Sequence, residues 1–338
     1  MIRATCLFAA GAAAILAGSP ALAAPTAAGN KPAARHFEFT YHAEVTGIPA
    51  GTKSVDVWLP YPPATEDQTI DHVRIDAPVP TRVTREKEYG NSMVYVHVEN
   101  PAMTSLPITM TFQVTRRERL RQDRLAASAG GGDARNAAAD PLVPRFLQGD
   151  RLVPIDARIT SMADSVAAGK TTPVDKARAI YDFEEATMTY DKTGTGWGHG
   201  DIYYACDAKH GNCTDFHAVF TGFCRAEGVP SRFEIGFPIP PDRGEGDVAG
   251  YHCWAQFYLK GHGWVPVDAS EGSKHADKRD YFFGDLDENR VQFSLGRDIT
   301  LSPAQKGEKL NYFVYPYVEV DGKPYDGVTK SFHYRDLP

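Results

Sequence analysis

A cysteine at the start of an amphipathic helix is the first feature of this sequence that can do chemistry. Gly211 and Asn212 form a polar turn before Cys213, and Gly228 and Pro230 end the helix that follows. The apolar stripe of this helix has i, i+3, i+4, i+7, i+8 spacing and consists of Phe216, Val219, Phe220, Phe223 and Cys224. Asn212 is a favoured N-cap residue, so Cys213 falls in the first turn. There the unpaired backbone N–H groups and the helix dipole stabilise a thiolate, which makes Cys213 a candidate nucleophile.

A predicted hairpin later in the chain supplies a histidine and an aspartate. Residues 251–259 and 264–268 are strand-like, and we expect a three-residue turn at 259–261 with Gly261 in the left-handed conformation. The expected cross-strand pairs are Tyr258 with His262, Gln256 with Trp264, Trp254 with Pro266, and His252 with Asp268. His252 and Asp268 would then lie side by side on one face, whereas a slip of one residue would separate them.

Together these residues supply a nucleophile, a base and an orienting carboxylate. Cys213 would attack a carbonyl carbon, His252 would take the thiol proton and pass it to the leaving amine, and Asp268 would hold the imidazole ring. Water or a second amine would then release the acyl group. The backbone N–H of Cys213 is one expected oxyanion donor. The candidates for the second donor or for substrate contacts are Tyr203, Tyr204, Asn212, Trp197, His217 and Trp254.

The same region permits a metal-binding interpretation. Cys206, His210, Cys213 and His217 have the spacing of a four-ligand zinc site, and the last two could share one ion from adjacent helical turns. That arrangement leaves the histidine and the aspartate of the hairpin without a role. We therefore predict no metal and no cofactor.

The motifs together resemble the transglutaminase-like superfamily, whose core is related to papain-type cysteine proteases. The matching pieces are Gly211-x-Cys213-x-x-Phe216, Arg225-x-x-Gly228-Val229-Pro230-Ser231-Arg232, Gly236, His252-x-Trp254 and Gly263-Trp264-x-Pro266-Val267-Asp268. The spacings also fit, with 39 positions from Cys213 to His252 and 16 more to Asp268. The resemblance covers residues 181–281 and implies a Cys-His-Asp triad at these three positions. His217 departs from it, since such helices more often carry a small residue there.

Alternating apolar residues predict β structure in the first part of the chain. The clearest sets lie at residues 37–45, 55–59, 94–98 and 108–114. We expect a small antiparallel β-sandwich domain at residues 36–118, with no cluster of catalytic residue types. The arginines that follow are expected on a solvated face, with a patch for an anionic partner as the alternative; they are Arg116, Arg117, Arg119, Arg121 and Arg124. An Ala- and Gly-rich stretch at 126–139 predicts a linker within residues 119–150.

The second half of the chain reads as helices followed by strands. Helical periodicity covers residues 156–168, and Thr172 with Pro173 begins a second helix. The glycine-rich loop at 194–200 lacks the lysine of a phosphate-binding loop and either lines a cleft or crosses the surface. We predict that residues 151–338 form an α+β catalytic domain with a papain-like transglutaminase core and C-terminal strands.

The N-terminal residues have the pattern of a signal peptide. Arg3 precedes an apolar stretch at 7–17, and a small-x-small cleavage site ends at Ala23. Residues 1–23 are therefore expected to direct export, to the periplasm or the medium. A formal net charge of −7 argues against a nucleic-acid partner, and no later stretch is apolar enough to predict a membrane span. In an oxidising compartment a disulfide between Cys206 and Cys253 is one option.

Residues and resemblance together predict thiol-dependent acyl transfer on amide bonds. Hydrolysis of peptide or isopeptide bonds in cell-envelope peptides or proteins is the first interpretation. Glutamine–lysine crosslinking is the second, because the same triad serves both reactions. A non-catalytic or zinc-binding module on the same fold is the third.

Overall fold

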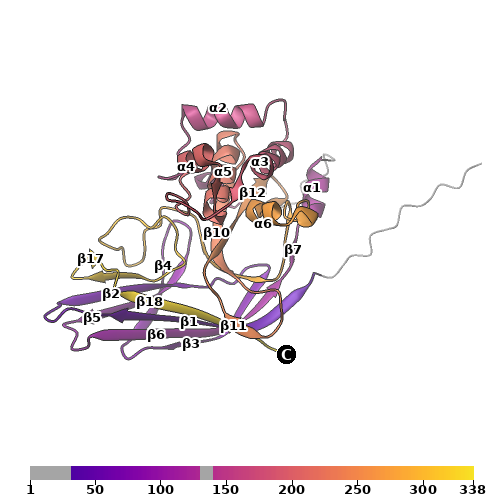
Figure 1. Ribbon diagram of the computed structural model, residues 1–338. Helices are drawn as coiled ribbons and strands as arrows, with labels where there is room; N and C mark the ends of the chain where they lie inside the picture. Colours follow the sequence, from indigo (N-terminus) through magenta and orange to yellow (C-terminus); the bar gives the residue numbers. More distant parts are fainter. Residues whose placement is uncertain (1–31, 130–139) are drawn as a thin grey trace, which may run out of the picture. The chain divides into compact units, whose positions relative to one another are not determined.

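The computed structural model describes residues 32–129 and 140–338, which fall within one unit from Pro32 to Pro338 (Figure 1). The predicted signal peptide at residues 1–23 lies outside the described residues, as does most of the Ala- and Gly-rich stretch at 126–139. Among the helices that are described, none is long and apolar enough to cross a membrane.

Strands with alternating buried residues form two five-stranded antiparallel sheets. The first sheet contains, in spatial order, β11 (Glu245–Asp247), β18 (Val328–Asp336), β1 (Ala34–Thr46), β6 (Ser105–Arg117) and β3 (Gln68–Asp76). The second contains β17 (Lys323–Pro324), β16 (Tyr317–Val320), β2 (Ser54–Tyr61), β5 (Ser92–Glu99) and β4 (Thr81–Arg85). Every second residue of β1 from Arg35 to Val45 is buried, and apolar side chains of both sheets share one core. The β structure predicted near the N-terminus is confirmed.

The last strands of the chain complete both of these sheets. β18 pairs with β1, with Phe332 opposite Tyr41, and β16 pairs with β2, with Val318 opposite Val57. The prediction that the C-terminal strands belong with the catalytic domain is therefore wrong, because their buried faces contribute to the sandwich core. The linker predicted at residues 119–150 stays a prediction.

Helices pack on one face of a separate four-stranded antiparallel sheet (Figure 1). Its strands are, in spatial order, β13 (Gly263–Val267), β12 (His252–Leu259), β10 (Ser231–Pro238) and β15 (Arg290–Leu295). The helices are α2 (Ala157–Val166), α3 (Pro173–Thr187), α4 (Ile202–Ala208), α5 (Cys213–Ala226) and α6 (Ala269–Lys274). α5 contacts the four other helices as well as β10 and β12, and its residues from Cys213 to Arg225 are all buried. The predicted α+β core is confirmed.

Short elements connect these layers. They are β7 (Arg119–Leu120), α1 (Gln122–Ala129), the 3₁₀ turn η1 (Arg145–Leu147), β8 (Thr189–Tyr190), β9 (His210–Gly211), the 3₁₀ turn η2 (Ala276–Lys278) and β14 (Asp285–Leu286). β7 pairs with β14, and β8 pairs in parallel with β9 just before α5. This last pairing places Tyr190 beside the start of the cysteine helix.

The arginine-rich segment, which begins at the end of β6, is not a solvated face throughout. Arg116 and Arg119 are buried. Arg119 donates from Nε to Asp67 at 2.6 Å and from Nη1 to Glu234 at 3.3 Å, so it joins the β2–β3 loop to β10. The predicted solvated face is wrong for these two residues, because the segment runs between the sandwich and the four-stranded sheet.

The hairpin of β12 and β13 forms in a register two residues away from the predicted one. Gln256 is opposite Pro266, not Trp264, and the turn closes with His262 N donating to Leu259 O at 2.9 Å. Leu259 is opposite Gly263, so the loop consists of residues 260–262. Gly261 in the loop and Gly263 directly after it both take positive φ, of 80° and 86°. A shift of two residues preserves the face of every side chain, so the prediction that His252 and Asp268 share a face survives the wrong register.

Candidate active site

Cys213 is fixed at the N-terminus of α5 by a capping arrangement. The Asn212 side chain accepts from Thr214 N at 2.9 Å, and Asp215 Oδ2 accepts from Asn212 N at 2.9 Å. Gly211 suits the position before this cap, because a Cβ there would clash with the Asp215 carboxylate. The predicted N-cap is confirmed, and Cys213 is 2% exposed.

Asp215 also ties the glycine-rich loop to the start of α5. Its carboxylate accepts from Gly198 N at 2.7 Å and from Gly200 N at 3.0 Å. Both glycines have positive φ, at 86° and 60°, a conformation that L side chains rarely adopt. The loop therefore supports the turn that presents Cys213.

His252 is hydrogen-bonded to Asp268 in a buried pair. The His252 Nε2 to Asp268 Oδ2 distance is 2.8 Å, and Arg290 Nη1 donates to the same oxygen at 2.9 Å. Asp268 is also the N-cap of α6, and its Oδ1 accepts from Glu271 N at 3.1 Å. Because Nε2 is engaged by the carboxylate, Nδ1 is the ring nitrogen left to face Cys213.

The charges of these groups stabilise one another. Burial raises the pKa of Asp268, but the charge and hydrogen bond of His252 and the charge of Arg290 outweigh it and hold that pKa well below its usual range. Burial lowers the pKa of His252, yet Asp268 and Cys213 raise it to about 10. Burial also raises the pKa of Cys213, but hydrogen bonds with Cys253 and His252 and the His252 charge bring it well below its usual value. The three shifts favour a thiolate–imidazolium pair beside an ionised carboxylate.

Cys253 and His217 lie behind the Cys213 thiol. The neighbouring Cys253 thiol helps to lower the pKa of Cys213, and its Sγ lies 3.7 Å from His217 Nδ1. His217 Nδ1 donates to the Cys213 carbonyl at 2.7 Å, which leaves Nε2 3.8 Å from Asp268 Oδ1 and without a hydrogen bond among residues 32–129 and 140–338. Burial lowers the pKa of His217, so this ring is neutral near pH 7. His217 packs against the triad residues from the core side.

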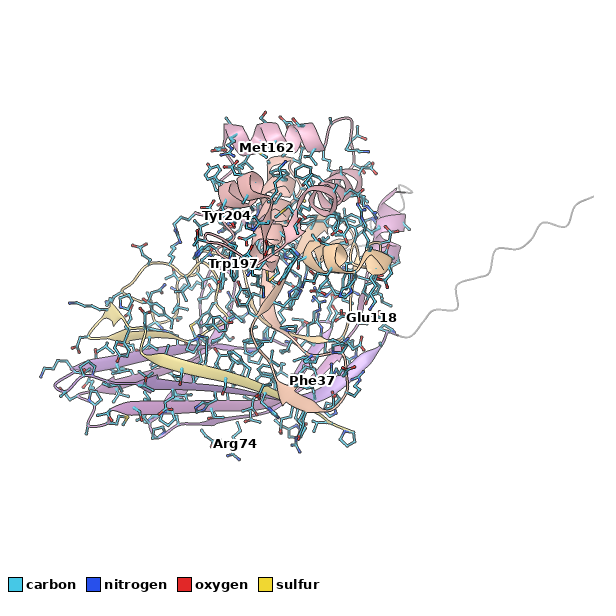
Figure 2. The ribbon with its side chains drawn as sticks, in the orientation of Figure 1. Phe37, Arg74, Glu118, Met162, Trp197 and Tyr204 are labelled. Atoms are coloured by element: carbon cyan, nitrogen blue, oxygen red, sulfur yellow. The ribbon has the colours of Figure 1, made fainter. Side chains whose placement is uncertain are left out.

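Three of the other predicted contact residues, Tyr203, Tyr204 and Trp254, are engaged by other partners. Tyr203 donates to Asp156 at 2.5 Å, Tyr204 lies 3.3 Å from His210 Nε2, and Trp254 donates to Glu234 at 2.5 Å. Trp197 is half-buried in the glycine-rich loop, and Figure 2 shows it with Tyr204 at the helical end of the fold. Asn212 stays close to Cys213, but its Nδ2 donates to Tyr251 Oη at 2.9 Å.

The zinc interpretation does not fit the positions of its four residues. In the described residues, no group of three or more His, Cys, Asp or Glu side chains is arranged to hold a metal ion. Cys206 packs with the helical core, and His210 turns to Tyr204. Cys206 and Cys253 are both free thiols, so the disulfide option is also wrong.

A cleft of about 630 Å³ opens in front of His252. Tyr190 and Tyr251 line it, as do Glu271 and Lys274 of α6, and Glu271 Oε1 is 3.8 Å from His252 Nε2. The Tyr251 hydroxyl lies 2.8 Å from Thr214 Oγ1, next to Cys213 along α5. Tyr251 therefore connects the wall of this cleft to the start of α5.

Sequence reasoning missed several residues of this site. Tyr251 carried a local signal, since it directly precedes His252, the first residue of β12. Tyr190 and Arg290 carried none, because β8 and β15 reach the site through long-range pairing with β9 and β10. Burial raises the pKa of Tyr190, and the charge of Cys213 adds to this shift.

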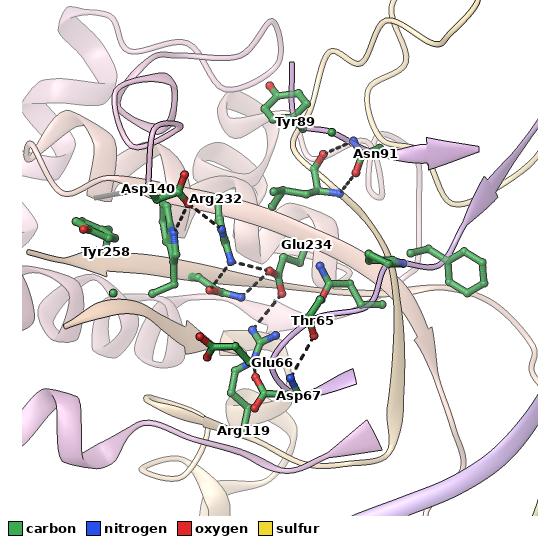
Figure 3. Close-up of a pocket in the computed structure, with 18 of the residues that line it drawn as sticks. Thr65, Glu66, Asp67, Tyr89, Asn91, Arg119, Asp140, Arg232, Glu234 and Tyr258 are labelled. Atoms are coloured by element: carbon green, nitrogen blue, oxygen red, sulfur yellow. Dashed lines mark hydrogen bonds and ion pairs between the residues drawn. The ribbon is translucent and has the colours of Figure 1, made fainter. Parts of the chain in front are cut away.

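A second cavity, of about 500 Å³, is lined by residues of the four-stranded sheet and of the sandwich (Figure 3). Figure 3 shows Glu234 in its wall, reached by Arg119 from one side and Arg232 from the other. The same carboxylate accepts from the Trp254 indole, and Arg290 lies over the Trp254 ring at 4.9 Å. This network braces the strand that carries His252.

Comparison with known proteins identifies the family of the helical part. The family model described as the transglutaminase-like superfamily matches residues 160–269, the segment that contains Cys213, His252 and Asp268. This segment belongs to the transglutaminase-like superfamily. The superfamily match begins in α2 and ends at the first residue of α6, so it covers the helices and the hairpin but not the sandwich.

Relatives of the whole chain extend beyond this segment. The chain is 27% identical over 334 aligned positions to an uncharacterized protein of Haemophilus influenzae, with coverage of 88% of this chain and 89% of that one. The crystal structure of "a Putative Cysteine Protease" from Cytophaga hutchinsonii aligns with a TM-score of 0.55 at 15% identity, over 90% of this chain and 100% of that chain. The periplasmic domain of TgpA from Pseudomonas aeruginosa aligns with a TM-score of 0.36 at 14% identity, over 69% and 91%. The Cytophaga structure shares the fold of sandwich and transglutaminase-like core together.

Proposed function

We propose that this protein hydrolyses peptide or isopeptide amide bonds through a Cys213–His252–Asp268 triad. The observation that carries the proposal is the buried 2.8 Å bond between His252 and Asp268 beside a cysteine at a helix N-terminus. Residues 151–295 would carry the chemistry, and the sandwich, completed by β16 and β18, would support it. The pattern at residues 1–23 supports export, with cell-envelope peptides or proteins as substrates.

The reaction follows from the positions of these groups. The Cys213 thiolate attacks the amide carbonyl, and the oxyanion forms near the N–H groups at the start of α5. The imidazolium of His252 donates its Nδ1 proton to the leaving amine, which breaks the C–N bond and leaves an acyl-enzyme. His252, now neutral, takes a proton from water as the water oxygen attacks the thioester carbon. The C–S bond then breaks, which releases the acid and restores the Cys213 thiolate and the His252 imidazolium. Asp268 remains ionised and orients the ring throughout.

A peptide library in ¹⁸O-labelled water with an added biotinylated amine tests this proposal. We expect new carboxyl groups that carry ¹⁸O and that are absent with Cys213→Ala, detected by mass spectrometry. Amine-conjugated products in place of free acids would favour the crosslinking reaction instead. If neither ¹⁸O-labelled acids nor amine conjugates form, a binding module on the same fold would be favoured.

A further inference from the structure

The cleft in front of His252 has two chemically different walls. One wall is apolar and comes from the loops after β10 and before β12; it comprises Pro238, Ile239, Pro240, Pro241, Val248 and Ala249. The opposite wall comes from β8 and the α6 region and carries three lysines, Lys192, Lys274 and Lys278. An extended substrate would therefore lie between an apolar surface and a cationic one.

Two of the three carboxylates that line the cleft are paired with a lysine or an arginine. Glu271 pairs with Lys274 at 2.6 Å and Asp287 with Arg290 at 3.3 Å, whereas Asp247 is exposed and has only His333 near it, at 3.0 Å. Lys192 and Lys278 are exposed and, within the described part of the chain, form no ion pair with these carboxylates. The cleft therefore has unneutralised positive charge in a protein whose formal net charge is −7.

In the second cavity, by contrast, three of the lining arginines contact buried carboxylates directly. In Figure 3 Arg119 and Arg232 both contact Glu234, and Asp67 takes up Arg119 as well. Arg121 contacts Asp67 at 3.2 Å. These arginines stabilise the junction between the layers, whereas the cleft lysines have no such role.

Two of the cleft lysines lie near the ring of Tyr190. Lys274 Nζ lies 3.8 Å and Lys192 Nζ 5.6 Å from the centre of the Tyr190 ring. Lys274 also contacts Glu271, whose Oε1 is 3.8 Å from His252 Nε2. Glu271 therefore lies next to His252, and the lysines of the cationic wall begin beyond it with Lys274.

We propose that the site selects acyl donors that carry a carboxylate close to the scissile amide, with Lys192 and Lys278 as the residues that determine this specificity. This inference rests on the proposed function, because it concerns substrates of the same thiol. The apolar wall receives the other side of the substrate backbone, so an acidic residue next to an apolar one fits the cleft best.

Two alkylating reagents of nearly equal size test the inference without a known substrate. Iodoacetate carries a carboxylate next to the reactive carbon, and iodoacetamide is its neutral counterpart. In Lys192→Glu/Lys278→Glu we expect the ratio of the Cys213 rate constants, iodoacetate over iodoacetamide, to fall about three- to tenfold at low ionic strength. Salt at about 0.5 M should reduce the wild-type ratio in the same direction.

The control changes net charge equally but outside the cleft. Lys87→Glu/Lys170→Glu alters two exposed lysines that do not line the cleft, and its ratio should stay within about 1.5-fold of wild type. A ratio that is unchanged in the cleft variant, or that falls equally in the control, would overturn the inference. If wild-type Cys213 reacts only at alkaline pH, the proposed function fails instead, and the ratio measured at pH 9 still decides the role of the lysines.

Discussion

Replacing Arg290 by methionine should strongly lower the free energy of unfolding, because its buried guanidinium group pairs with two carboxylates. Arg290 is 2% exposed and donates to Asp268 at 2.9 Å and to Asp287 at 3.3 Å. Removing one partner of a buried pair leaves the other charge uncompensated, at about 3–5 kcal/mol. Lysine cannot reach both carboxylates with one ammonium group, so Arg290→Lys should recover only part of the loss. Urea unfolding of both variants at pH 7 measures these free energies.

The pH dependence of this loss separates an electrostatic effect from a packing effect. The pKa of folded Asp268 is depressed, so its contribution to stability is present above the unfolded pKa of about 3.9 and is lost as the pH falls through the folded value. The gap between wild type and Arg290→Met should therefore narrow as the pH falls below about 4. Arg335→Met is the control, since its 2.8 Å pair with Glu38 is exposed and should add little. Equal losses in the two variants, or a gap independent of pH, would refute the reasoning.

Three further changes probe the site. Cys253→Ala removes a hydrogen bond to the Cys213 sulfur, so the pKa of Cys213 should rise and alkylation at pH 6 should slow about tenfold, with little change at pH 9; equal rates at pH 6 would contradict the assigned bond. Asp268→Asn removes the charge that raises the pKa of His252, so alkylation at pH 6 should slow by about 10- to 100-fold while circular dichroism reports an intact fold; an unchanged pH profile would show that Asp268 does not tune the pair. Asp215→Ala removes the acceptor for Gly198, Gly200 and Asn212 and should cost about 2–4 kcal/mol in urea unfolding; a loss below about 0.5 kcal/mol would contradict its role in fixing the helix start.

Local patterns predicted the parts of the site that depend on sequence neighbours. The Asn212 cap and the α5 stripe follow from residue type and 3.6-residue periodicity, and the structure confirms both. The hairpin prediction gave the correct face for His252 and Asp268 with the wrong register, because two glycines at 261 and 263 made the turn ambiguous by two residues. A register error of two residues leaves each side chain on the same face of the sheet, and an alternating sequence pattern cannot detect it.

Features made by contacts between distant segments could not be predicted in this way. β18 and β16 show no regular alternation of buried residues, and only pairing with β1 and β2 reveals that they complete the sandwich. Arg116 and Arg119 read as solvated because an arginine's burial depends on carboxylates elsewhere, here Asp67 for Arg119. Arg290 was missed for the same reason, since its partner Asp268 lies on another strand's end.

The most direct test of the central claim is the rate of Cys213 alkylation by iodoacetamide at pH 6 and pH 8, in wild type and in His252→Ala. A thiolate–imidazolium pair predicts wild-type rates within about threefold of each other, because the pKa of Cys213 lies well below its usual value. Without His252 the rate at pH 6 should collapse. A wild-type rate that falls about 75-fold from pH 8 to pH 6, as for an ordinary thiol of pKa about 8.5, would contradict the activated nucleophile.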